Sequence, residues 1–233
     1  PRELRSIVYQ RAKGQTQTLP FGTQRDVYAP QHEWVQHSML PKTLGLDDVR
    51  VKVGGPRCQR PYSASILNVS AMSYGSLSWA AIEALNKGAA KSNFYHNTGE
   101  GGISKYHRRW GGDLVWQLGT GYFGCRTPDG NLDFDKFAEK ATHAQVKMVE
   151  LKLSQGAKPG KGGMLPASKV TPEIAEVRGV PEGRDVISPS SHKAFSSPIE
   201  LMQLIEKLRE LSGGKPVGIK LCIGKKSEFY SLC

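Results

Sequence analysis

A cationic, glycine-rich loop, Leu153–Gly163, contains the residues of greatest chemical interest in this chain; it reads LSQGAKPGKGG. The loop follows an apolar run, Val146–Leu153, and carries Gln155, Lys158 and Lys161. Glycine allows the backbone to approach a ligand closely, and lysine supplies positive charge. The loop therefore predicts a site for an anion or a cofactor at the end of a strand.

Two loops of the same type lie upstream, at Asn97–Ser104 (NTGEGGIS) and Leu118–Gly124 (LGTGYFG). Three glycine loops after apolar runs indicate one site assembled from several strand ends. A phosphate-binding P-loop is excluded, because Gly162 follows Lys161 where that motif requires serine or threonine. We therefore do not expect a kinase or an ATPase.

Strand, loop and helix alternate from Ala64 onward, which predicts a parallel sheet with crossover helices. We expect about six strands, at Ser65–Met72, just before Asn97, and at Leu114–Leu118, Gln145–Leu153, Asp185–Ser188 and Val217–Cys222. We expect helices at Trp79–Ala90 after a Ser78 cap, at Phe134–His143, from Thr171-Pro172, at Ile199–Leu211 after Ser197-Pro198, and at Ser227–Leu232. A closed barrel needs eight strands, so six are too few.

Composition narrows the class of protein. The 233 residues carry a formal net charge of +11, but the positive charges are scattered, which argues against nucleic-acid binding. The four cysteines show no paired spacing, so we expect no metal site and reduced thiols. No apolar run is long enough for a membrane helix, and no signal peptide opens the chain.

Seven motifs, in order, resemble the FMN-binding domain of glutamate synthase, in particular the stand-alone FMN-binding group. They are SAMSYGS (70–76), KSNFYHNTGEGG (91–102), GTGYFG (119–124), QGAKPGKGG (155–163), LPASKV (165–170), ISPSSH (187–192) and GIKL (218–221). The resemblance implies an α/β fold of the (β/α)8 TIM-barrel type. About six of the eight strands would lie in residues 63–233, and residues 1–62 would form an extended arm packed on the barrel.

The resemblance also implies an activity. Reduced FMN would pass a hydride to 2-iminoglutarate, formed from 2-oxoglutarate and ammonia, and yield glutamate. The open alternatives are another FMN barrel oxidoreductase acting on a keto, imino or hydroxy acid, and a non-catalytic assembly subunit.

Site residues follow from the matched motifs. The backbone N–H groups of Ala71, Met72 and Ser73 would face the flavin ring. Gln155 would form a hydrogen bond with the pyrimidine edge of the ring, and Lys220 would stabilise the negative charge of the reduced flavin. Lys158 would serve the same flavin or bind a substrate carboxylate. The proton-handling groups are Glu100 and His192, with Lys220 and Glu100 catalytic and His192 a substrate contact.

Each role has a structural alternative. Lys220 would be a surface lysine that ends a strand, and Gln155 would cap its loop. Glu100 would then pin its loop through a lysine or arginine, His192 would orient a turn, and Met72 would pack in the core.

The chain also departs from the family pattern. Lys161 stands where the family often has an acidic residue or histidine, and SPSSH replaces SPPPH. The strands that cradle the FMN phosphate, and the cysteines of an iron–sulfur cluster, would lie beyond Cys233, so we expect a fragment. We expect a cytoplasmic oligomer with a reductase or amidotransferase partner, and membrane attachment only through a segment before Pro1.

Overall fold

The structure is a computed structural model that describes residues 2–15, 26–33, 36–156, 158 and 160–232. It divides into two units, Pro1–Thr43 and Leu44–Cys233. The first unit contains α1 (Arg2–Ala12). The division falls ahead of residue 62, where we placed the end of the arm. Packing of the arm on the barrel remains a prediction.

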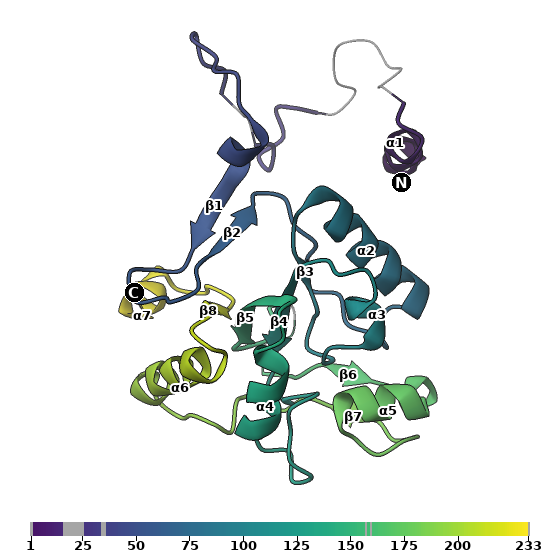
Figure 1. The fold of residues 1–233 in the computed structure, drawn as a ribbon, viewed down its shortest axis with the longest axis vertical. Coiled ribbons are helices and arrows are strands. Elements are labelled where there is room, and N and C mark those ends of the chain that lie inside the picture. The colour runs from purple at the N-terminus through teal and green to yellow at the C-terminus, as the bar shows by residue number, and fades with distance from the viewer. Residues whose placement is uncertain (1, 16–25, 34–35, 157, 159, 233) are drawn as a thin grey trace. The chain divides into compact units, whose positions relative to one another are not determined.

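The second unit is built on a parallel sheet in the order β3–β4–β5–β8 (Figure 1). Its strands are β3 (His96–Asn97), β4 (Leu114–Leu118), β5 (Val146–Lys152) and β8 (Val217–Lys220). All five residues of β4 are buried, as is typical of a parallel strand covered on both faces. This confirms an α/β fold with a parallel sheet.

Helices α4 (Phe134–Ala141) and α6 (Pro198–Leu211) share one hydrophobic core with β4, β5 and β8 (Figure 1). The ring of Phe137 on α4 stacks on Trp116 of β4 with the centroids 5.3 Å apart. In α6, Leu201, Leu204, Ile205 and Leu208 are buried. Their spacing of three and four residues puts them on one helical face, which is the face that covers the sheet.

The expected helix caps are confirmed. Ser78 accepts a hydrogen bond from the backbone of Ala81 at the start of α2 (Trp79–Ser92). Thr171 and Ser197 cap α5 (Pro172–Arg178) and α6 in the same way, each followed by proline at the first helical position. The remaining helical elements are η1 (Leu46–Val49), α3 (Lys105–Arg108), η2 (Ala167–Lys169) and α7 (Lys226–Leu232).

For two of the expected strands, the prediction that they belong to the parallel sheet is wrong. In Ser65–Met72 only Val69 and Met72 pair with β3: Val69 forms an isolated parallel bridge to His96, and the Met72 N–H donates to Asn97 O. Asn68 Oδ1 accepts the Tyr95 N–H in place of a backbone carbonyl. Ser65 instead ends β2 (Tyr62–Ser65), which pairs antiparallel with β1 (Arg50–Val53). The sheet therefore has four strands and one bridge, not six strands.

The second correction concerns Asp185–Ser188. Its central pair forms β7 (Val186–Ile187), which pairs antiparallel with β6 (Met164–Leu165) outside the parallel sheet. The Ser188 N–H continues this pairing with a 2.9 Å hydrogen bond to Gly163 O. Within the described residues, no helix is both long and apolar enough to cross a membrane.

Candidate functional site

Three polar side chains meet at the carboxyl ends of the strands. Glu100 lies in the loop after β3, Lys152 is the last residue of β5, and Gln155 lies three residues further. Lys152 Nζ is 3.3 Å from Glu100 Oε2, and it donates to Gln155 Oε1 at 2.9 Å. Gln155 Nε2 lies 2.9 Å from both carboxylate oxygens of Glu100. We call these three residues the carboxylate cluster.

Glycines close tightly around Glu100. A Cβ atom at Gly119 would lie 2.6 Å from Glu100 Oε2, and one at Gly163 would lie 2.5 Å from Oε1. Glu100, Gly119 and Gly163 belong to the three glycine loops in turn. The structure therefore brings all three loops to one carboxylate, and a side chain at either glycine would displace it.

The ion pair in this cluster is shielded from water. The side chains of Lys152 and Glu100 retain only 14% and 18% of their accessible surface. A charge pair held this far from solvent interacts more strongly than a surface pair, and removing one partner leaves the other charge poorly solvated. The lysine expected as a partner of Glu100 is thus Lys152, and Gln155 binds Glu100 and Lys152 directly.

A cavity of about 210 Å³ adjoins the cluster. Its polar walls include Ser73, Glu100, Gln155, Lys158 and Arg178. Lys158 is exposed, whereas Arg178 retains 4% of its surface. The cavity thus combines two cations with the cluster, which is the charge pattern of a carboxylate or phosphate site.

Arg178 projects from the buried face of α5. Its Nη2 donates to Tyr74 O at 3.1 Å, while its buried Nε has no hydrogen-bond partner among the described residues. Burial lowers the pKa of this guanidinium, and the negative charge of Glu100 opposes that shift. A buried arginine with an unused donor beside a cavity is suited to binding an anion.

His192 is held by its neighbours. Its Nε2 donates to Lys152 O at 2.8 Å, and its Nδ1 accepts from the Tyr122 hydroxyl at 3.0 Å. Burial lowers its pKa, which favours the neutral ring. Since both ring nitrogens are occupied, His192 fixes the backbone at Lys152 in this structure. A direct contact with substrate stays a prediction.

The segment Ala71–Ser73 offers backbone donors at the same end of the sheet. The Met72 N–H is used by Asn97 O at 3.0 Å, whereas the Ala71 and Ser73 N–H groups have no acceptor among the described residues. His107 Nε2 donates to Met72 O at 3.0 Å, and this hydrogen bond holds the segment in place. The Met72 side chain packs against a hydrophobic core cluster.

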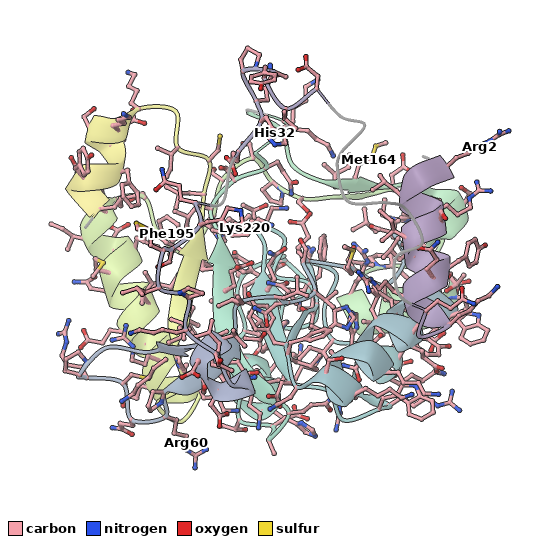
Figure 2. All side chains as sticks on the ribbon, turned by 90° about the horizontal axis from the view of Figure 1, so that it is seen from above. Arg2, His32, Arg60, Met164, Phe195 and Lys220 are labelled. Carbon is pink, nitrogen blue, oxygen red and sulfur yellow. The ribbon has the colours of Figure 1, made fainter. Side chains whose placement is uncertain are left out.

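Lys220 ends β8, opposite Lys152 in the register. Its side chain is exposed, and its carbonyl accepts the Leu153 N–H at 2.9 Å. In Figure 2, Lys220 lies at the carboxyl end of β8 and Arg60 at the opposite end. Arg60 is tied to the turn before β8 by a 2.9 Å hydrogen bond from its N–H to Gly214 O.

This donor set is chemically suited to the ring of a flavin. A flavin ring accepts hydrogen bonds along its pyrimidine edge and gains negative charge on reduction. Free N–H groups at Ala71 and Ser73, the Gln155 amide, and the cations Lys152 and Lys220 supply what such a ring requires. Gln155 would have to exchange one of its bonds to Glu100 for a bond to the ligand.

Two residues of this site were not singled out from the sequence, Lys152 and Arg178. Lys152 follows Glu150 on one face of β5, so two charges at alternate positions of a mostly apolar strand were the available signal. Arg178 lies four residues after buried Ile174, on the apolar face of α5. A charged residue on a buried helical face was the signal there.

Comparison with known proteins identifies the family. Residues 13–232 match the family model described as "Conserved region in glutamate synthase". The chain is 43% identical over 194 residues to the glutamate synthase large subunit-like protein YerD of Bacillus subtilis, covering 82% of the chain and 36% of that relative. It is 39% identical over 153 residues to the archaeal-type glutamate synthase [NADPH] of Thermotoga maritima, covering 65% of the chain and 28% of that protein.

The chain thus spans about a third of the length of the curated relatives it matches. The family match covers nearly every described element, including the carboxylate cluster and Arg178. The chain belongs to the glutamate synthase family.

Proposed function

We propose that this chain provides the FMN-binding and substrate-binding region of a glutamate synthase that makes glutamate from 2-oxoglutarate and ammonia. The observation that carries the proposal is the carboxylate cluster beside the cavity that Arg178 and Lys158 line. Its chemistry suits a dicarboxylate substrate next to a flavin. When bound, FMN supplies the hydride that reduces the imine carbon.

Cofactor contacts come from the strand ends. We assign the N–H groups of Ala71 and Ser73, together with Gln155, to the flavin ring. Lys220 supplies positive charge that favours the reduced, anionic flavin. Met72 holds its segment in place through the bonds to Asn97 and His107.

Substrate contacts come from the cations of the cavity. Arg178 and Lys158 bind carboxylate groups of 2-oxoglutarate, because a guanidinium and an ammonium are the usual partners of such groups. Glu100 is the proton-handling group. Lys152 Nζ, 3.3 Å from Glu100 Oε2, keeps a proton within reach of that oxygen. His192 positions Lys152 through its backbone carbonyl.

The test uses the intact protein reconstituted with FMN. The flavin absorbance bands should appear, bleach on anaerobic reduction, and return when 2-oxoglutarate and ammonium are added together, with glutamate detected by mass spectrometry. Arg178→Lys should raise the 2-oxoglutarate concentration needed for half-maximal reoxidation by about tenfold or more, because the bidentate guanidinium is lost. Arg184→Lys, an exposed arginine in the same unit, is the matched control.

The outcomes separate the alternatives. Bleaching without reoxidation by 2-oxoglutarate and ammonium would indicate a flavin enzyme with another keto, imino or hydroxy acid substrate. Failure to bind FMN at all would overturn the enzymatic proposal and favour an assembly subunit. Requirements for a reductase or amidotransferase partner would appear as dependence on added electron donor or on glutamine.

A further inference from the structure

Tyr74 contacts both ends of the helix that carries Arg178. Its hydroxyl donates a 2.7 Å hydrogen bond to Oε2 of Glu173, in the first turn of α5. Its carbonyl oxygen accepts a 3.1 Å hydrogen bond from Nη2 of Arg178, the last residue of α5. Tyr74 also directly follows Ala71–Ser73, the segment assigned above to the flavin ring. One residue therefore joins that segment to the helix of the substrate-binding arginine.

The hydroxyl of Tyr74 is a well-defined donor. Tyr74 retains 7% of its accessible surface and belongs to the same hydrophobic core cluster as Ile174 of α5. Burial raises the pKa of Tyr74, as does the hydrogen bond to Glu173, so the hydroxyl keeps its proton. Hydrogen bonds from Lys105 and Tyr74 lower the pKa of Glu173, so the carboxylate is ionised. A hydrogen bond to an ionised acceptor is stronger than one between neutral groups.

Two other side chains bind Glu173. Lys105 Nζ lies 2.8 Å from Oε1, but the lysine side chain is 70% exposed and contributes little to stability. The Tyr106 hydroxyl donates to Oε2 at 3.1 Å. Within the part of the chain that the structure describes, neither Lys105 nor Tyr106 forms a hydrogen bond with Arg178. Tyr106 thus resembles Tyr74 in its bond to the carboxylate and differs in having no bond to the arginine.

The guanidinium of Arg178 is closely packed. Its Cζ lies 5.3 Å from the centroid of the Phe123 ring. A Cβ atom at Gly101 would lie 2.9 Å from Arg178 Nη2, and one at Gly75 would lie 3.4 Å from it. Because so little space surrounds the guanidinium, a displacement of α5 or of the Tyr74 carbonyl would change the direction of the donors that line the cavity.

We propose that Tyr74 is the positioning residue for Arg178. Its carbonyl orients the guanidinium, and its hydroxyl, through Glu173, fixes the start of the helix that presents Arg178 to a substrate carboxylate. The inference rests on the proposed function, since it names how the substrate-binding arginine is held. Paired N–H donors recognise a carboxylate only when the guanidinium plane is correctly oriented. Loss of the Tyr74 hydroxyl therefore lowers the affinity for the substrate.

The main variant is Tyr74→Phe, which removes the hydroxyl and keeps the ring and the backbone carbonyl. 2-Oxoglutarate is titrated by calorimetry into the intact protein loaded with FMN. We expect the dissociation constant to rise about fivefold, because one hydrogen bond that fixes α5 is lost. The 2-oxoglutarate concentration for half-maximal flavin reoxidation should rise by a similar factor, and the maximal rate should fall less than about twofold. A loss of stability alone would leave the affinity of the folded protein unchanged.

Matched variants separate Tyr74 from its neighbours. Tyr106→Phe removes the other hydroxyl from Glu173 and should change the dissociation constant less than about twofold. Tyr230→Phe, at an exposed tyrosine, should bind 2-oxoglutarate like the unmodified protein. Glu173→Ala should weaken binding at least as much as Tyr74→Phe. Adding Tyr74→Phe to Glu173→Ala should have no further effect, because the hydroxyl acts through that carboxylate.

A readout without substrate tests the same contact. Hydrogen exchange of the α5 backbone, followed by mass spectrometry, should be several-fold faster in Tyr74→Phe than in Tyr106→Phe. If the unmodified protein does not bind 2-oxoglutarate, the proposed function fails. Faster exchange of α5 in Tyr74→Phe would then still support the role of Tyr74 in holding Arg178, and unchanged exchange would overturn it.

Two results would overturn the inference while leaving the proposed function intact. One is an unmodified protein that binds 2-oxoglutarate and a Tyr74→Phe variant that binds it equally well. The other is an equal loss of affinity in Tyr74→Phe and Tyr106→Phe, which would show that only the number of hydrogen bonds to Glu173 matters.

Discussion

The two ends of the parallel sheet handle charge in opposite ways. At the carboxyl end, Glu100, Lys152 and Gln155 satisfy one another within 3.3 Å and are largely shielded from water. At the amino end, Arg108 donates a hydrogen bond to His143 Nε2 at 2.6 Å and forms no ion pair with a carboxylate among the described residues. The first arrangement balances its charges internally, and the second leaves a cation without a carboxylate partner.

The difference shows how each end would take a ligand. A ligand at the carboxyl end must exchange bonds with groups that already have partners, so binding there rearranges the carboxylate cluster. An anion at the amino end would meet Arg108, a cation whose hydrogen-bond partner is a neutral acceptor and not a carboxylate. Because buried polar groups are costly when unpaired, the first end is also the more sensitive to substitution.

The largest effect is expected from Glu100→Ala. It leaves Lys152 shielded from water without its counter-charge and Gln155 without its acceptor. We expect the free energy of unfolding to fall by about 3 kcal/mol, measured by urea denaturation. Glu228→Ala, which breaks an exposed pair with Lys225 at 3.9 Å, should cause no measurable change. Equal losses in the two variants would remove the contrast between a shielded pair and a surface pair.

A second test concerns the glycine loop that closes the carboxyl end. A Cβ at Gly162 would lie 1.7 Å from Ser188 O, so Gly162→Ala forces the backbone apart. We expect a loss of about 2 to 3 kcal/mol in thermal or urea unfolding. Gly156→Ala lies in the same loop, has no atom within 4 Å of the added carbon, and should be close to neutral. If both variants unfold alike, the loop does not pack as described.

Acid should lower the free energy of unfolding, because two buried histidines resist protonation in the folded protein. Burial lowers the pKa of His107 to about 4 and, with help from His107, that of His96 to about 3. The unfolded chain therefore takes up protons near pH 6.5 that the folded chain does not. Stability is full above pH 6.5 and falls toward pH 4, by about 1.4 kcal/mol per pH unit for each histidine.

The pH slope has its own pair of variants. The free energy of unfolding is measured by urea denaturation at each pH between about 6.5 and 4. In His107→Gln, its dependence on pH should fall by the contribution of about one proton. His37→Gln, at an exposed histidine, should leave the slope unchanged. An unchanged slope in His107→Gln would show that this ring already carries a proton in the folded protein.

The smallest effect on stability is expected from Lys220→Ala, because that side chain is exposed. We expect a change of less than about 0.5 kcal/mol in the free energy of unfolding. In the FMN-loaded protein, loss of the positive charge should make the flavin reduction potential more negative, by about 30 mV for an interaction of about 1.4 kcal/mol. An unchanged potential would remove Lys220 from the proposed cofactor site.

Local pattern predicted much of the fold. The caps at Ser78, Thr171 and Ser197 and the strands β4 and β5 were predicted correctly, because their signals are short and lie within each element. The partner of a strand is a non-local choice. The strand expected at Ser65–Met72 and β7 were misplaced because Asn68 and Gly163 take up hydrogen bonds that the sheet would have used.

The sequence by itself determined that three glycine loops follow strands of one parallel sheet and that Glu100 and Gln155 belong to them. Only the tertiary structure decided that Lys152 and Arg178 complete the site and that His192 holds the backbone of Lys152. Loop composition is visible along the chain. The partner of a charged side chain depends on which strand ends and helix faces come together, and this is set by packing between distant residues.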